Sequence, residues 1–262
     1  MHPIVTLTTD FGHKGPFVAV MKGVMLQHAP EVRIVDLTHE ILVHWPAEAG
    51  FWLSRAYRYF PAGTVHVAVV DPGVGTERNI IAVEFDRHVF LAPDNGLLTL
   101  VIRSATNYKA WRLSDDWYRN QGWPQPSSTF HGRDIFAPLA AGVATGAILP
   151  AEIGPSTRDL VPSLLEEPLV ADGEIQGSVV TIDHFGNLIT NIDGSLIAAL
   201  PRPRVRVGSL HLDIRTTYGD VSPGDFLALI NSFGVLEIAR SEGSAADGLG
   251  LGRGAPVLVR KN

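Results

Sequence analysis

Two residues of opposite charge and one histidine are the side chains whose types and spacing could do chemistry. Asp71 and Arg78 lie seven positions apart in VVDPGVGTERN, residues 69–79. A carboxylate and a guanidinium in one tight loop can pair, which holds both groups charged and oriented. His131 lies in a second polar stretch, STFHGRDIFAP, and histidine readily moves protons near neutral pH. The competing interpretation is structural, because exposed Asp–Arg pairs are common and contribute little.

Polar residues also follow the apolar runs of the N-terminal half. Asp10 ends the first run, Asp36 lies near the end of the second, Asp71 follows the third, and Asn95 follows VFLAP. In open α/β sheets, ligands bind outside the carboxyl ends of the strands, so these residues predict one polar edge. Asp and Asn also favour turns and helix N-caps, which explains any one of them better than it explains all four.

Two polar stretches in the C-terminal third could add to a binding site. IDHFGNLITN and INSFGVLEIAR place carboxylate, amide and hydroxyl groups beside aromatic rings, the second at an expected hairpin turn. The residues concerned are Asp183, Phe185, Asn187, Asn231 and Ser232.

Several known catalytic motifs are excluded. The triplet Asp10-Phe11-Gly12 matches the magnesium-binding triplet of protein kinases, but no His-Arg-Asp loop occurs in the sequence. There is no Gly-x-x-x-x-Gly-Lys phosphate loop, no Gly-x-Gly-x-x-Gly after a first strand and no Gly-x-Ser-x-Gly elbow. The chain has no cysteine and no His-Glu-x-x-His pair. His39 and His44 have a spacing with little metal specificity, so we expect no metal and no cofactor.

The elements that must position these residues alternate between strand and helix in the first half. Apolar runs predict strands, with a hairpin across Asp86-Arg87, and helical spacing predicts helices. The strands are expected at residues 4–8, 32–37, 64–70, 79–85 and 88–93, and the helices at 17–29, 47–60 and 135–146. This order is typical of an α/β layer with a mostly parallel central sheet.

The pattern changes after a stretch that is rich in proline, serine and acidic residues. Beyond Gly173 the sequence shows short strands with turn signals and no helix of ten or more residues. Closely spaced strands of this kind predict a smaller, all-β, barrel-like domain. We therefore expect an α/β domain at residues 1–160, a linker at 161–173 and the β domain at 174–262.

Composition sets limits on the partners. Hydrophobic residues make up 45% and charged residues 18% of the 262 residues, which is ordinary for a globular protein. The net charge of −6 comes without basic runs, so neither nucleic acid nor a membrane surface is expected as a partner. The first residues lack the features of a signal peptide, and no apolar stretch is long enough to span a membrane. A cytoplasmic location is expected.

The same stretches carry a resemblance to a known family. The sequence resembles the S-adenosylmethionine (SAM) hydrolases, also called SAM hydroxide adenosyltransferases, which are related to the adenosyl fluorinase and chlorinase. The matching stretches, in family order along nearly the whole chain, are TTDFG, VDLTHEI, FPAGTVHVAVVDPGVGTERN, LAPDNGLL, TFHGRDIFAP, IDHFGNLITN and INSFGVLEIAR.

This resemblance implies a fold, a partner and a reaction. The family combines an α/β domain with a β-barrel-like domain and forms a homotrimer that binds substrate between neighbouring subunits. Its hydrolases convert SAM to adenosine and methionine by in-line attack of water at C5′. The resemblance places the catalytic Asp–Arg–His set on Asp71, Arg78 and His131.

The resemblance also implies which residues bind the substrate. Asp10 would hold the ribose hydroxyls, Tyr218 would stack on adenine, and Ser232 would hold the methionine carboxylate. Asn187, with Asp183 nearby, would meet the methionine end or the ribose, and Phe130 would line the reacting carbon. The complete expected set is Asp10, Asn95, Phe130, Asp183, Phe185, Asn187, Tyr218, Asn231, Ser232 and Phe233.

The sequence departs from the halogenases of this group at several positions. Halogenases carry an aromatic residue where Asp71 stands, and hydroxyl residues at positions occupied here by Val74 and Gly132. An anion beside a halide site would repel its ligand, so Asp71 favours water as the nucleophile. The open alternatives are a SAM-dependent chlorinase, a non-catalytic SAM- or adenosine-binding protein, and a nucleoside hydrolase that acts at C1′.

Overall fold

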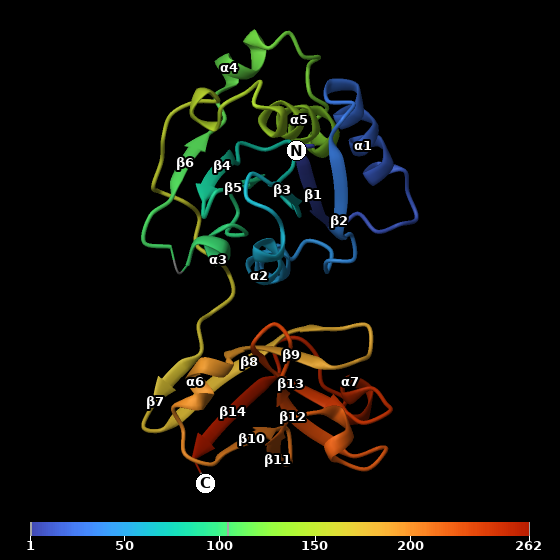
Figure 1. Cartoon of the computed structure of the whole chain (residues 1–262), viewed down its shortest axis with the longest axis vertical. Helices are drawn as coiled ribbons and strands as arrows, with labels where there is room; N and C mark the ends of the chain where they lie inside the picture. Colours follow the sequence, from blue (N-terminus) through green and yellow to red (C-terminus); the bar gives the residue numbers. More distant parts are fainter. Residues whose placement is uncertain (1, 104, 262) are drawn as a thin grey trace. The chain divides into compact units, whose positions relative to one another are not determined.

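The computed structural model describes residues 2–103 and 105–261. The chain divides into two compact units, Met1–Leu164 and Leu165–Asn262 (Figure 1). Each unit has its own hydrophobic core, so each is described separately. Among the described residues, no helix is long and apolar enough to cross a membrane.

The first unit is built on a mixed, mostly parallel sheet with the strand order β2-β1-β3-β5-β4-β6. Neighbours from β2 to β5 run parallel, whereas β4 pairs antiparallel with both β5 and β6. The strands are β1 Ile4–Thr9, β2 Arg33–Thr38, β3 Val65–Val69, β4 Ile80–Phe85, β5 His88–Pro93 and β6 Lys109–Arg112. The three central strands are almost wholly buried, as expected for a parallel sheet covered on both faces.

Helices cover both faces of this sheet (Figure 1). Helices α1 (Phe17–His28) and α5 (Ala137–Thr145) pack together over one face, where Met21, Met25 and Leu139 are buried. Helices α2 (Pro46–Ala56) and α3 (Thr99–Ile102) cover the other face. A π-helical turn, η2 Gly132–Phe136, leads into α5, and α4 (Asp115–Asn120) starts at the N-cap Ser114. Single 3₁₀ turns lie at Tyr57–Tyr59 (η1) and Pro150–Glu152 (η3).

The second unit is a closed β-barrel. Its strands follow the order β14-β10-β11-β12-β13-β9-β8-β7, and β14 also pairs with β8, which closes a ring of seven strands and leaves β7 outside it. The strands are β7 Leu169–Ala171, β8 Glu174–Ile182, β9 Leu188–Asp193, β10 Pro203–Val207, β11 Leu210–Arg215, β12 Phe226–Ile230, β13 Val235–Arg240 and β14 Pro256–Lys261. The short helices α6 (Gly194–Ala198) and α7 (Ala245–Leu249) and the turn η4 (Tyr218–Asp220) complete it.

The predicted fold class is confirmed, and the differences lie at the ends of elements. The hairpin between β4 and β5 turns at Asp86 and Arg87, whose φ angles of 49° and 64° suit a tight two-residue turn. The helix expected at 47–60 ends earlier, because the chain tightens into 3₁₀ geometry from Tyr57. Strand β6 and helix α4 were not predicted, since short runs such as KAWR carry too few residues to show a period. The predicted linker contains the three-residue strand β7, and the domain limits stay a prediction.

Candidate active site

A glycine determines how closely two loops of the first unit approach. Gly75, in the loop after β3, has a φ of 77°, and a Cβ added there would lie 2.1 Å from the carbonyl oxygen of Ser128. No residue with a side chain fits this approach without moving the backbone. The loop that carries Asp71 and Arg78 therefore lies directly against the segment that leads to His131.

Asp71, Arg78 and His131 form one hydrogen-bonded set. Arg78 Nε donates to Asp71 Oδ2 at 3.0 Å, and Arg78 Nη2 donates to the same oxygen at 2.5 Å. Arg78 Nη2 also lies 2.7 Å from His131 Nδ1. The Asp71 and Arg78 side chains are only 4% and 11% exposed, so water screens this pair far less than a surface pair. The structure thus brings His131 together with Asp71 and Arg78, which were predicted from a different stretch of the sequence.

The contact with Arg78 fixes the protonation of His131. A guanidinium can only donate hydrogen bonds, so Nδ1 of His131 must accept and the ring proton must lie on Nε2. Burial lowers the pKa of His131, the charge of Arg78 lowers it further, and Asp71 and Asp134 oppose the shift. His131 is therefore neutral near pH 7, which is the form that can accept a proton.

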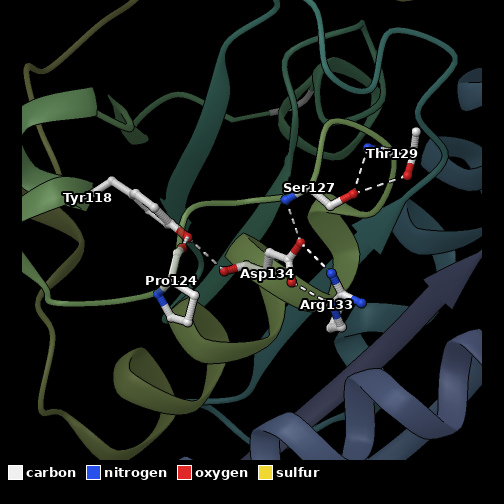
Figure 2. A network of polar contacts seen from close by, with 6 residues as sticks. All are labelled: Tyr118, Pro124, Ser127, Thr129, Arg133 and Asp134. Atoms are coloured by element: carbon white, nitrogen blue, oxygen red, sulfur yellow. Dashed lines mark hydrogen bonds and ion pairs between the residues drawn. The ribbon is translucent and has the colours of Figure 1, made fainter.

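A network of polar contacts holds the segment before His131 (Figure 2). The Asp134 carboxylate accepts from the backbone N–H of Ser127 at 2.8 Å and from Arg133 Nη2 at 2.9 Å. The hydroxyl of Tyr118 lies 3.0 Å from the carbonyl oxygen of Pro124 and 3.2 Å from that of Asp134. Burial alone would raise the pKa of Asp134, but the bonds from Arg133 and Ser127 outweigh it and the pKa is lowered. Asp134 is thus a charged anchor for this loop.

The other expected residues of the first unit lie at ends of the same sheet or beside its loops. Asp10, just after β1, accepts a hydrogen bond from the backbone N–H of His44 at 2.9 Å. Asn95, after β5, donates from Nδ2 to the carbonyl oxygen of Val70 at 2.9 Å, which ties it to the residue before Asp71. Its Oδ1 is buried and has no hydrogen-bond partner within the described residues, so it is an acceptor available to a ligand or water.

Phe130 lies in an aromatic cluster next to His131. Its ring packs edge-on against Phe11 and Phe17, with centroids 6.0 Å and 5.4 Å away. A cavity of about 820 Å³ opens beside Arg78 and His131. The predicted catalytic set therefore has an aromatic neighbour on one side and open space on another.

In the second unit, Asp183 organises the turn between β8 and β9. Its carboxylate accepts from the backbone N–H groups of Phe185 and Asn187, each at 2.9 Å, and from Asn187 Nδ2 at 3.0 Å. Asn187 is buried, whereas the ring of Phe185 is 75% exposed. The turn thus combines an exposed aromatic ring with a fixed carboxylate–amide pair.

A buried glutamate that the sequence reasoning missed joins two other expected residues. Glu237, on β13, accepts from the hydroxyl of Tyr218 at 2.8 Å and from Asn231 Nδ2 at 3.2 Å. It is 2% exposed, and burial raises its pKa despite these two bonds. Glu237 could have been recognised from the sequence, because it is a charged residue among the apolar residues of VLEIAR. Strands of a barrel normally direct apolar side chains into the interior. Ser232 and Phe233, at the hairpin tip, lie at the surface of this unit.

Each unit therefore gathers its own share of the expected residues. In the part of the chain that the structure describes, no group of three or more histidine, aspartate or glutamate side chains is arranged to hold a metal ion. The roles of the individual residues toward a substrate stay predictions.

The class of this protein is defined by its two units. The first is a mixed α/β unit with a buried Asp–Arg–His set, and the second is a closed β-barrel. The chain matches the SAM hydroxide adenosyltransferase N-terminal domain over residues 5–154 and the C-terminal domain over residues 177–258. It belongs to this family.

The similarity to known proteins extends over nearly the whole chain. A protein of Thermus thermophilus named (R)-S-adenosyl-L-methionine hydrolase is 40% identical over 99% of this chain and 100% of its own length. A protein of Salinispora tropica with the same name is 40% identical over 98% and 97%. A fluorinase of Nocardia brasiliensis is 30% identical over 98% and 97%. The crystal structure of an uncharacterized conserved protein from Thermotoga maritima superposes with a TM-score of 0.88 at 34% identity, over 98% of this chain and 100% of that one.

Proposed function

We propose that this protein hydrolyses S-adenosyl-L-methionine to adenosine and L-methionine. The observation that supports this most is the buried, hydrogen-bonded Asp71–Arg78–His131 set, because a site that only binds a nucleoside does not require it. Full-length identity of 40% to proteins named (R)-S-adenosyl-L-methionine hydrolase supports the same substrate.

The chemistry determines what the site must supply. Water attacks C5′ in line with the C–S bond, a C5′–O bond forms, the C5′–S bond breaks, and one proton is released from the water. The sulfonium leaves as a neutral thioether, so the leaving group needs no acid. The difficulty lies in the nucleophile, because water is a weak one. Holding the water and the substrate in the reactive geometry can lower the activation barrier by several kcal/mol.

Each member of the set can take one part of this task. Asp71 holds the guanidinium of Arg78, and the positive charge of Arg78 stabilises hydroxide character as it develops on the water. His131 receives the proton, since its lowered pKa keeps it neutral. Its Nδ1 is bonded to Arg78, so proton transfer to this atom requires Arg78 to release the ring and turn toward the water.

The remaining contacts of the proposal follow the family resemblance. Asp10 holds the ribose, Tyr218 stacks on adenine, and Ser232 binds the methionine carboxylate. The other expected residues line the same substrate, namely Asn95, Phe130, Asp183, Phe185, Asn187, Asn231 and Phe233. We also propose a homotrimer whose neighbouring subunits complete the site, and a cytoplasmic location.

Water is favoured over halide at this site for two physical reasons. Asp71 carries a negative charge within the proposed catalytic set, and a carboxylate beside a halide would repel it. Gly132 supplies no hydroxyl group to cradle a halide, and a side chain added there would require its neighbours to shift, since its Cβ would lie 3.0 Å from Met21 Sδ and 3.2 Å from the Phe130 ring.

The test is incubation of the protein with SAM, with and without chloride, followed by chromatography of the nucleosides. We expect adenosine and methionine in both cases, and a loss of both in Asp71→Asn. Formation of 5′-chloro-5′-deoxyadenosine would assign the protein to the halogenases, and free adenine would indicate cleavage at C1′. Saturable binding of SAM without turnover would contradict the hydrolase and leave a binding protein.

A further inference from the structure

A chain of polar side chains, partly exposed at Lys22 and Asp36 and buried at His39 and Thr9, lies beside the loop that carries Asp10. Lys22 Nζ donates to Asp36 Oδ2 at 2.6 Å, and Asp36 Oδ1 lies 3.1 Å from His39 Nε2. His39 Nδ1 lies 2.9 Å from Thr9 Oγ1. His39 is 1% exposed and Thr9 is 0% exposed, so both lie inside the first unit.

The contacts of this chain are consistent with one arrangement of its protons. Thr9 Oγ1 accepts from the backbone N–H of Phe11 at 3.2 Å and can donate its own hydroxyl proton to His39 Nδ1, which lies 2.9 Å away. In this arrangement the ring proton of His39 is on Nε2, which lies 3.1 Å from Asp36 Oδ1 without forming a well-aligned hydrogen bond to it. Burial would raise the pKa of Asp36, but the interactions with Lys22 and His39 outweigh it and the pKa is lowered. The Asp36 carboxylate therefore stays charged, and its negative charge favours the tautomer of His39 that carries the proton on Nε2.

This chain holds the backbone on both sides of Asp10. The side chain of Thr9 binds the N–H of Phe11, and the carbonyl oxygen of His39 accepts from the N–H of Gly12 at 2.9 Å. The segment after His39 returns to Asp10 itself, since the N–H of His44 donates to its carboxylate. The N–H of Ile41 also donates to the carbonyl oxygen of Thr9 at 3.4 Å, so residues 9–12 and 39–44 are joined at four points, two of which involve His39.

The acid–imidazole–hydroxyl order of Asp36, His39 and Thr9 is also that of a nucleophilic triad. Two observations exclude this role for the arrangement in the structure. Thr9 is fully buried, and its Oγ1 is already bound by the Phe11 N–H. No substrate atom reaches that oxygen without opening the loop, so the chain positions its neighbours and does not attack a substrate.

We propose that His39 is a positioning residue that holds the Asp10 loop in the geometry that binds substrate, through Thr9 and through its own carbonyl group. The part of this inference that concerns substrate rests on the proposed function. The part that concerns the loop does not, because it follows from the contacts alone.

The test compares two buried histidines that both contact strand β1. His39→Ala removes the bond to Thr9, whereas His39→Asn keeps an acceptor near the position of Nδ1. His66→Ala is the matched control, because His66 is 0% exposed and its hydrogen bonds go to Thr6 of strand β1, at 2.8 Å, and to His88 of strand β5, at 3.1 Å. All three variants are compared at a temperature where each is folded.

Amide hydrogen exchange of residues 10–13 gives the readout that needs no substrate. We expect His39→Ala to raise exchange there by at least tenfold over wild type, His39→Asn to restore part of the protection, and His66→Ala to raise it by no more than its lower free energy of unfolding explains. Equal exchange in His39→Ala and wild type, or equal increases in His39→Ala and His66→Ala, would overturn the proposal.

Kinetics with SAM give the second readout. We expect His39→Ala to raise KM about tenfold or more with a smaller change in kcat, and to add little in a background of Asp10→Ala, since both changes impair the same proposed contact between Asp10 and the substrate. A KM equal to that of wild type, or fully additive effects, would overturn the role toward substrate. If wild-type protein does not convert SAM, the proposed function fails, and the exchange experiment still decides the role of His39.

Discussion

Two histidine clusters in the first unit show how partners decide what a buried histidine does. His131 has charged neighbours, Arg78 and Asp71, and lies beside a cavity. His66 lies inside the sheet between neutral partners. Its Nδ1 is 2.8 Å from Thr6 Oγ1, its Nε2 is 3.1 Å from His88 Nδ1, and its ring stacks on Phe90 with the centroids 5.0 Å apart.

Both histidines have lowered pKa values, but for different reasons. Burial lowers the pKa of His66 to about 3, with His88 as a minor cause, whereas at His131 the charge of Arg78 adds to burial. The pair of His66 and His88 needs one unprotonated nitrogen at its contact, so a second proton would place two donors face to face. A low pKa alone therefore does not identify a catalytic residue, and charged partners beside an open cavity do more to mark one.

The largest expected effect is on catalysis at the first cluster. We expect His131→Ala to lower kcat by about 10²–10⁴-fold, the usual contribution of a general base, while SAM still binds. Adenosine release gives kcat, and titration calorimetry of SAM gives binding. A kcat close to that of wild type would remove His131 from the mechanism and make the two clusters equivalent.

The corresponding change in the second cluster should affect stability alone. We expect His66→Ala to lower the free energy of unfolding by about 2–4 kcal/mol, because it leaves a cavity and removes partners from Thr6 and His88. Denaturant unfolding measures this loss. The exposed His211 on β11 is the matched control, and His211→Ala should change stability by less than about 0.5 kcal/mol. A large loss of kcat in folded His66→Ala would contradict the distinction.

Acid should reveal the second cluster in the unmodified protein. The unfolded chain binds a proton at His66 near the ordinary pKa of about 6.5, and the folded chain does so only near about 3. The stabilisation is therefore fully present above pH 6.5 and is lost progressively as the pH falls from 6.5 toward 3. This one group should cost about 2 kcal/mol between pH 7 and pH 5. The free energy of unfolding, measured at pH 7 and pH 5, should fall less in His66→Gln than in the wild type. An equal fall in both proteins would exclude His66 as the cause.

A smaller effect should sharpen the electrostatics of the first cluster. Asp134 raises the pKa of His131, so Asp134→Asn should lower it and move the acid limb of the kcat profile to lower pH, by about 0.3–1 unit. The pH dependence of kcat measures the shift. Asp213→Asn removes an exposed carboxylate that pairs with Arg204 in the second unit, and it should leave the limb in place. A shift to higher pH would contradict the charge effect.

Local patterns predicted much of the fold and part of the site. The Asp71–Arg78 pair lies within eight residues of one loop, and the β4–β5 hairpin needs only Asp86 and Arg87, so short-range chemistry was sufficient. His131 lies 53 residues from Arg78, and their contact depends on the approach of Gly75 to Ser128, which no periodicity reveals.

The residues that support the site were harder to see for a physical reason. Glu237 and His39 lie where a strand or a loop normally buries apolar groups, and they are tolerated because each has polar partners from elsewhere in its unit. The supporting role of Glu237 and His39 depends on those partners, which are distant in sequence. Asp134 was visible, but it could equally have been a helix cap.

The contact between Gly75 and the Ser128 carbonyl has a consequence for how this site tolerates sequence change. The spacing between Arg78 and His131 depends on two backbones in contact, and not on the size of any side chain between them. An exposed neighbouring position such as Glu77 can therefore change in sequence without altering the distance between Arg78 and His131. A single added methyl group at position 75, in contrast, would separate them while leaving the fold and both hydrophobic cores intact.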